Sequence, residues 1–428
     1  MTLASLPWSF KLVFGFISDN FPIGGKRRKP YFIMGWAVYI VVNLCTAMQE
    51  TPHIQWLAGG ALVSSMGFML SDVTTDAILV ERSKHEPIEN RGSMQAIGYS
   101  VRFMGSLLGS VMGMLLYNKD SWGWGLSIQQ LFFLNGVFPI VLMGPWVWHL
   151  RETAITHAGD VPVGERLRLQ CKEVFRALEQ RAVYVPMGVL DVFVFLLSQV
   201  PNAAWRSFLV DGLDFSPFQT GILAVVGSLM ASLGLLAYKK WFFHANWRSI
   251  YVWTTLIVTF FSASQILLIL RVNLALGIND LAFSIGDDSI ADFVASIQFL
   301  PVVQMASRYI SMCPDGVEGT TYAILTTMGN VAMAASYSVG TLMTGIWDVS
   351  NEAFIRGDFS GMWKLTLLTS FIQPFPLLFV RFLPGSQEEQ RVLQRSGIRN
   401  KWGGIVLLLV LFGSLSWTII LSIMELSS

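Results

Sequence analysis

Apolar stretches of about twenty residues recur along the whole chain, and each is long enough to cross the hydrocarbon core of a bilayer as a helix. Eleven stretches are of full length, and one at the start is incomplete. They run approximately 1–17, 31–49, 54–80, 93–117, 126–150, 183–205, 217–237, 249–270, 289–311, 319–346, 360–382 and 403–425. Strands of a membrane barrel would be about half as long and would alternate strictly. The pattern therefore predicts an all-α, polytopic membrane protein.

Composition and loop charge agree with this class and give an orientation. Hydrophobic residues make up 53% of the chain and charged residues only 13%, about half of the ~25% usual in soluble domains. If the loop holding residues 26–29 is cytoplasmic, the cytoplasmic loops up to residue 311 hold seventeen Lys or Arg, against four or five in the opposite loops, where Lys364 lies at a boundary. Such a bias is typical of the positive-inside rule. The net charge of +1 argues against a nucleic-acid partner.

The longest polar stretch divides the spans into two groups. We expect an N-terminal bundle (1–150), a cytoplasmic linker (151–182), a C-terminal bundle (183–382), a cytoplasmic segment (383–402) and one more span (403–425). The basic loops 20–30 and 239–248 should then lie at the same membrane face. In the linker, apolar residues from Leu167 to Leu178 recur at helical spacing among basic residues, which predicts an amphipathic helix on the inner membrane surface. Its expected role is a strap between the bundles; the alternative is a regulatory partner site.

The loop between the first two spans carries the most specific motif. Residues 15–19 read GFISD, and residues 22–30 read PIGGKRRKP. Gly15 allows close helix contact, and Asp19 lies at a helix end where it can pair with Arg27, Arg28 or a facing helix N-terminus. This motif resembles the loop between the second and third helices of the major facilitator superfamily. The resemblance implies that these four residues gate the cytoplasmic side, and we expect Asp19 to approach the span that begins near Gly319.

A narrower resemblance covers about residues 5–385. Residues 7–31 (PWSFKLVFGFISDNFPIGGKRRKPY), 71–81 (SDVTTDAILVE) and 313–323 (CPDGVEGTTYA) resemble the folate–biopterin transporter family. The resemblance implies a major facilitator fold of two pseudo-symmetric helical bundles, with the family's first helix missing here and one helix added at the C-terminus. It also implies a monomeric secondary transporter, a proton symporter by expectation, that moves a folate, a pterin or a related anionic heteroaromatic solute by alternating access.

Five charged residues fall within spans, where charges are costly and usually mark a pathway or a paired site. These are Lys11, Asp72, Asp76, Arg102 and Asp191. At 1.5 Å per helical residue, the first four lie about 9–15 Å below the cytoplasmic end of their helices, and Asp72 and Asp76 share a helix face. We therefore expect one polar layer with an Arg102–Asp72 ion pair. Its expected role is substrate binding, and the alternative is a set of ion pairs that hold the bundle together.

Other patterns narrow the remaining choices. The chain has no phosphate-binding GxxxxGK[ST] loop, no paired His/Glu metal motif and no GxSxG elbow, so we expect neither an enzyme nor a metal or cofactor site. The alternatives to a folate or pterin carrier are a major facilitator carrier for another metabolite, such as a nucleoside-like or sulfonium compound, and a truncated, non-transporting membrane protein. Gly105, Gly109 and Gly113 form a stripe that predicts close helix packing.

Overall fold

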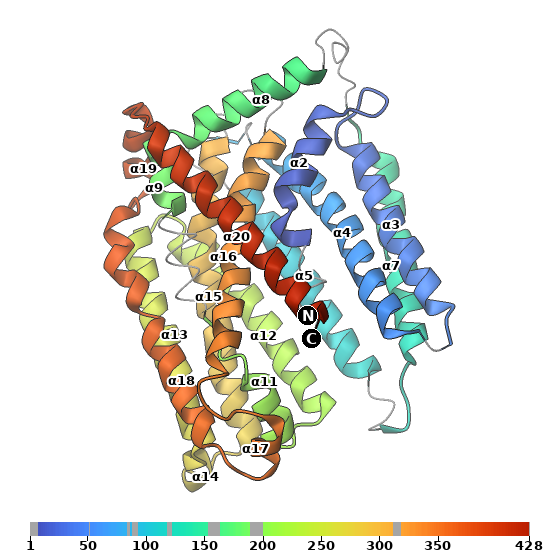
Figure 1. The fold of residues 1–428 in the computed structure, drawn as a ribbon, viewed down its shortest axis with the longest axis vertical. Coiled ribbons are helices and arrows are strands. Elements are labelled where there is room, and N and C mark those ends of the chain that lie inside the picture. The colour runs from blue at the N-terminus through green and yellow to red at the C-terminus, as the bar shows by residue number, and fades with distance from the viewer. Residues whose placement is uncertain are drawn as a thin grey trace.

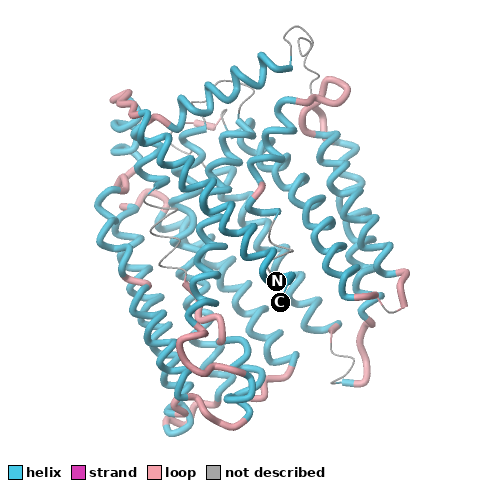
Figure 2. The backbone as a smooth tube through the Cα atoms, viewed as in Figure 1, coloured by secondary structure: helices cyan, strands magenta, loops and turns pink. Residues whose placement is uncertain are grey.

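The protein is built from helices in every part of the chain that the structure describes. The computed structural model describes residues 7–50, 52–83, 86–87, 93–117, 122–152, 163–188, 200–310 and 318–427. Within those ranges the only extended pairing is two isolated bridges, Ile23 with Lys26 and Gln180 with Arg399. Long helices run between short loops that gather at two ends of the molecule (Figure 2). The predicted all-α class is confirmed.

The first half of the chain, up to residue 152, forms one group of packed helices (Figure 1). These are α2 (Lys11–Asn20), α3 (Lys29–Ala47), α4 (Ile54–Ser83), α5 (Ser93–Leu116) and α7 (Ile128–His149). Helix α3 packs against both α4 and α7. At the α3–α4 crossing, Gly35 and Gly67 face each other so closely that a Cβ on Gly67 would lie 2.7 Å from the Gly35 carbonyl oxygen. The absence of side chains at both positions therefore sets the spacing of these two helices.

The second half, from residue 181, forms the other group. Its longer elements are α9 (Arg181–Met187), α12 (Pro217–Ala237) continued by η4 (Tyr238–Phe242), α13 (Trp247–Ile269), α15 (Asp280–Ile310), α16 (Glu318–Met343), α18 (Ser360–Ile372) and η5 (Phe375–Phe382); its shorter ones are α11 (Trp205–Ser207), η3 (Phe208–Gly212), α14 (Val272–Ala275) and α17 (Asn351–Ile355). Helix α12 starts with a capping box, in which Ser216 and Gln219 satisfy each other's backbone N–H groups. The two halves meet along α5 with α12 and along α2 with α16.

A linker helix joins the halves at one end, and a C-terminal helix lies beside it there. Helix α8 (Val163–Leu178) lies across that end, next to α9, and α19 (Gln387–Arg395) lies beside α9 (Figure 1). The turn before α13 is there too, because the Trp247 N–H donates to the Gly385 carbonyl at 2.8 Å. The loop after α2 meets α8 at the same place, so the two basic loops share one end as expected. We call this the basic end.

Helix α20 (Lys401–Ser427) follows α19 and crosses the outer side of α16 obliquely (Figure 1). Its Leu407 and Leu411 are buried in a core cluster with Leu178 of α8 and Tyr322 of α16. The C-terminal segment is thus packed onto the second half and onto the linker.

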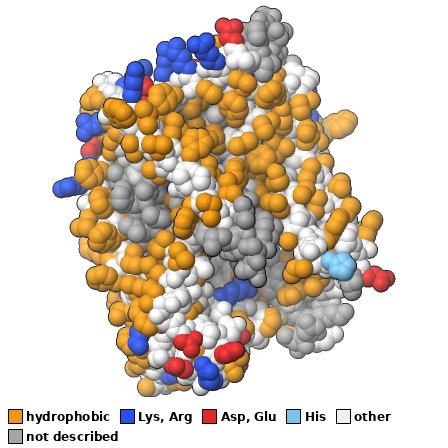
Figure 3. Space-filling view, viewed as in Figure 1, with side chains coloured by type: hydrophobic (Ala, Val, Ile, Leu, Met, Phe, Trp, Pro, Cys, Tyr) orange, Lys and Arg blue, Asp and Glu red, His pale blue; other side chains and the backbone are white. Residues whose placement is uncertain are grey.

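The surface carries apolar side chains where a soluble protein would carry charges. Seven of the described helices are long and apolar enough to cross a membrane. Large residues such as Trp148 and Phe371 are exposed, at 86% and 75%, whereas Thr327, Ser336 and Thr366 are completely buried. In the space-filling view, apolar side chains cover most of the face, and most of the charged ones lie toward its ends (Figure 3). This inverted pattern is the one that a lipid solvent favours, and it confirms a multi-pass integral membrane protein.

One packing prediction is wrong. A Cβ added at Gly105, Gly109 or Gly113 would meet nothing within 4 Å, and all three residues are exposed. Helix α5 instead approaches α12 on another face, where Gly221 lies against Met114 and the Ser110 and Ser228 hydroxyls are 3.1 Å apart. A small-residue stripe shows that close contact is sterically allowed, but it does not specify which face the neighbouring helix uses.

Candidate functional site

Four of the charged residues within the predicted spans lie in one cluster. The Lys11 ammonium Nζ donates to Asp72 Oδ2 at 2.7 Å and to Asp76 Oδ2 at 2.5 Å. Arg102 Nη2 is 2.9 Å from Asp72 Oδ1 and 2.6 Å from Asp76 Oδ1. Each base therefore contacts both acids, and the cluster is formally neutral. We call these four residues the charge cluster.

Three helices of the first half bring the charge cluster together. Lys11 begins α2, Asp72 and Asp76 lie one turn apart on α4, and Arg102 lies on α5. Burial differs sharply among the four side chains, since Lys11, Asp72 and Asp76 are 3%, 7% and 2% exposed and Arg102 is 32% exposed. Removing three charges from solvent is tolerable only because each is paired. Arg102 is therefore the most exposed member of the cluster.

Two tyrosines connect the charge cluster to the second half of the chain. The Arg102 guanidinium lies 5.2 Å from the ring centre of Tyr99, one helical turn away on α5. The Tyr99 hydroxyl is 3.2 Å from that of Tyr322 on α16, and the Tyr99 ring meets Phe299 of α15 edge-on with ring centres 5.0 Å apart. These residues were not predicted from the sequence. Tyr99 could have been found from its i, i+3 spacing to Arg102, whereas Phe299 carries no such signal.

The predicted gating residues lie at the basic end of α2, and two of the four, Asp19 and Arg28, contact each other there. Arg28 Nη1 donates to Asp19 Oδ1 at 2.6 Å, and its Nη2 donates to Glu81 of α4 at 2.6 Å. Burial would lower the pKa of the Arg28 guanidinium, but Asp19 and Glu81 raise it above its ordinary value. Gly15 is buried, one turn before Asp19.

The other carboxylate oxygen of Asp19 reaches across to the second half. Asp19 Oδ2 accepts hydrogen bonds from the Thr320 backbone N–H and from its hydroxyl, both at 2.7 Å. Thr320 lies in the first turn described for α16, where free N–H groups and the helix dipole favour a carboxylate. This is the approach of Asp19 to the α16 N-terminus that the sequence predicts.

Arg27 is not part of this contact. Its backbone N–H, together with the N–H groups of Arg28 and Lys29, donates to the carboxylate of Glu152 at 2.7–2.9 Å. Glu152 therefore fixes the start of α3, a role that was not predicted from the sequence. A carboxylate is favourable at a helix N-terminus for the same electrostatic reason as at Thr320.

Two sequence predictions remain, one about Asp191 and one about metal binding. Asp191 lies outside the described residues. Among the residues that are described, no group of three or more His, Cys, Asp or Glu is placed to hold a metal ion.

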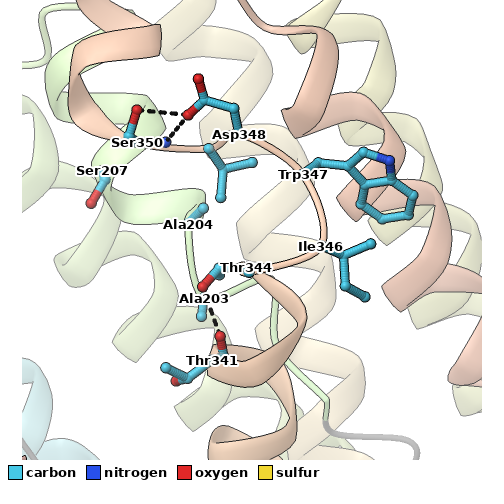
Figure 4. Close-up of a pocket in the computed structure, with 11 residues that line it drawn as sticks. Ala203, Ala204, Ser207, Thr341, Thr344, Ile346, Trp347, Asp348 and Ser350 are labelled. Carbon is cyan, nitrogen blue, oxygen red and sulfur yellow. Dashed lines mark hydrogen bonds between the residues drawn. The ribbon is translucent and has the colours of Figure 1, made fainter.

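A cavity of about 620 Å³ lies at the opposite end of the second half, between the start of α11 and the loop after α16 (Figure 4). Its one carboxylate, Asp348, already accepts hydrogen bonds from the Ser350 hydroxyl at 2.7 Å and its N–H at 3.2 Å. These bonds lower the pKa of Asp348. The charge cluster, with its four buried or half-buried charges, is the stronger candidate site.

Comparisons with known proteins agree on one family. The sequence profile described as the BT1 family matches residues 1–400. The folate–biopterin transporter of Synechocystis sp. is 27% identical over 400 residues, which span 90% of this chain and 74% of that protein. The probable folate–biopterin transporter 2 of Arabidopsis thaliana is 25% identical (89% and 74%), and folate transporter 1 of Plasmodium falciparum is 24% identical (94% and 75%).

Among solved structures, the human organic anion transporter MFSD10 (TETRAN) superimposes with a TM-score of 0.49 at 13% identity, over 88% of this chain and 82% of that one.

Proposed function

The chain belongs to the BT1 family, and on that premise we propose that it is a secondary transporter of a folate, a pterin or a related anionic heteroaromatic solute. Membership confirms the resemblance drawn from the sequence, and it makes the protein a membrane transporter and not an enzyme. The solute is the part that we infer. The single observation that carries it is the charge cluster, a buried set of carboxylates with one half-exposed arginine.

The chemistry of such a solute matches the groups in the charge cluster. A pterin ring has an amino–imino edge that a carboxylate can bind with two hydrogen bonds, and a folate tail has carboxylates that a guanidinium binds in bidentate fashion. Both ion pairs of Arg102 use the same nitrogen, Nη2. A solute carboxylate could therefore bind at another edge of this guanidinium before either pair breaks.

The position of the cluster suits alternating access. It lies beside the contact between α5 and α16, where the Tyr99 and Tyr322 hydroxyls join the two halves. At the basic end, the Asp19–Thr320 contact holds the halves together. We infer that the two halves rock as bundles, that Asp19 and Arg28 gate the basic end, and that a solute displaces an ion-pair partner. An aspartate released from its partner could then take up a proton, which would couple transport to a pH gradient.

Uptake into vesicles tests this proposal. Purified protein in liposomes is assayed with labelled folate, with biopterin, which has no carboxylate, and with S-adenosylmethionine, each with and without a pH gradient. Arg102→Ala should abolish folate uptake. Arg102→Lys should restore little of it, because an ammonium group cannot bind a carboxylate in the bidentate way that a planar guanidinium does. Arg271→Ala, which removes a surface ion pair with Asp280, is the matched control and should transport normally.

Three outcomes separate the possibilities. Folate uptake that fails in Arg102→Ala, while the control Arg271→Ala transports normally, supports the proposal. Uptake of S-adenosylmethionine alone would show that the protein is a transporter, but that its solute is neither a folate nor a pterin. Folate uptake that survives in Arg102→Ala would show that the charge cluster only holds the first half together.

A further inference from the structure

Helix α8 touches both halves of the chain through one buried side chain. Gln170 is 5% exposed, although its neighbours Leu169 and Cys171 face outward. Its Oε1 accepts a short hydrogen bond from Asn20 Nδ2 at the end of α2. Its Nε2 donates to the Thr320 hydroxyl oxygen at the start of α16, at 2.9 Å. Both ends of the amide are therefore used, one toward each half.

These bonds close a ring with the contact described above. Asn20 follows Asp19 directly, and Asp19 bonds the same Thr320 hydroxyl that receives Gln170. The four side chains are between 0% and 5% exposed. A buried amide left without partners costs about 1–3 kcal/mol, so Gln170 fits this position only while α2 and α16 stay together. The ring has members from α2, α8 and α16.

The other end of α8 is fixed to the second half by backbone hydrogen bonds as well as by packing. Leu178 is buried with Tyr322 and with Leu407 of α20. Just after the helix, the Glu179 carbonyl accepts from the Asn400 N–H at 2.8 Å, and the Arg181 N–H donates to the Ile398 carbonyl at 2.9 Å. If the halves separate at the basic end, α8 must therefore stay with the second half and break its bond to Asn20.

We propose that α8 takes part in gating at the basic end, and that Gln170 is a positioning residue that stabilises the closed arrangement of α2 and α16. From the sequence, this segment is expected to be a strap between the bundles, with a regulatory partner site as the alternative. A strap would limit how far the halves separate, whereas Gln170 changes the equilibrium between closed and open arrangements. The proposal rests on the inferred rocking of the two halves, but its test does not depend on which solute is carried.

Distances between spin labels at the basic end measure that equilibrium. Labels are placed at Ile23, an exposed residue of the first half, and at Lys239, an exposed residue of the second half. The native cysteines (Cys45, Cys171 and Cys313) are first replaced with serine. The distance distribution is then measured by pulsed electron paramagnetic resonance on the full chain in lipid nanodiscs, without solute.

Three variants are compared on this background. Gln170→Ala should reduce the ratio of closed to open molecules roughly tenfold, because two buried hydrogen bonds are lost. Gln170→Glu keeps the size and the acceptor for Asn20, but it replaces the donor to Thr320 with a carboxylate close to Asp19 and should shift the ratio further. Lys172→Ala, on the exposed face of α8, should leave the distribution as in the wild type.

If Gln170→Ala does not fold, the isosteric variant Gln170→Glu still tests the proposal. A shift toward longer distances in the folded Gln170 variants, with none in Lys172→Ala, supports the proposal. An unchanged distribution in either folded Gln170 variant overturns it, and so does an equal shift in Lys172→Ala. Because no solute is present, failed uptake of folate or pterin would count against the proposed function and would leave this result standing.

Discussion

Replacing Lys11 with Met tests whether the charge cluster is a balanced unit. Methionine keeps most of the volume of the side chain, so the change removes charge with little loss of packing. In the structure, Lys11 is 3% exposed and is the partner of both Asp72 and Asp76 at 2.7 and 2.5 Å. Its loss leaves two buried carboxylates with only Arg102 between them.

The size of the effect follows from that geometry. Removing one partner of a buried ion pair typically costs about 3–5 kcal/mol, because the other charge stays buried and unpaired. Changing Asp76 to Asn as well restores neutrality, since Arg102 and Asp72 remain as one pair at 2.9 Å. We therefore expect Lys11→Met to lower the free energy of unfolding by about 3–5 kcal/mol, and the double variant Lys11→Met/Asp76→Asn to recover more than half of that loss.

Unfolding in detergent micelles, followed by tryptophan fluorescence and by the fraction that stays monodisperse on heating, gives the comparison. Lys240→Met, at an exposed position beside Trp241, is the matched control and should change stability by less than about 0.5 kcal/mol. The reasoning is refuted if Lys11→Met is as stable as the control. It is also refuted if the double variant loses as much stability as the two single variants added together, because additive losses mean that the charges do not interact.

Three further changes address other contacts. Asp19→Ala removes the acceptor of both Thr320 bonds, so the basic end should open more often; labelling of a cysteine placed at that end by an impermeant thiol reagent should become faster, and an unchanged rate would contradict the gate. Gly35→Ala puts a methyl group against the Gly67 backbone and should lower stability by about 1–3 kcal/mol through separation of α3 and α4; a normal unfolding midpoint would show that the helices adjust. Tyr322→Phe loses the hydroxyl contact with α5 and should cost about 1 kcal/mol of stability with normal insertion; an unchanged stability would mean that this contact carries no net energy.

Much of the fold was predictable because a bilayer leaves few choices. Backbone groups in hydrocarbon must be satisfied within their own segment, so a stretch of twenty apolar residues predicts a helix with little ambiguity. The predicted stretch 93–117, for example, is observed as Ser93–Leu116. Short-range spacing was equally informative in the charge cluster, where Asp72 and Asp76 share a face through the helical repeat alone. Which helices are neighbours was harder to predict, as the exposed glycine stripe on α5 shows, because lipid and protein interiors are equally apolar.

By itself, the sequence determined the helical class, the grouping of basic residues in loops that share one end, and the need for charges within the spans to be paired. These features depend on length, periodicity and the cost of burying charge, all of which are local. Only the tertiary structure decided that Lys11 contacts both aspartates, that the Tyr99 and Tyr322 hydroxyls meet, and that Gln170 lies between α2 and α16. Asn20 and Thr320 are separated from Gln170 by 150 residues each, and no local pattern contains contacts of that range. They arise from the way whole helices pack, which depends on the shapes of all the side chains between them.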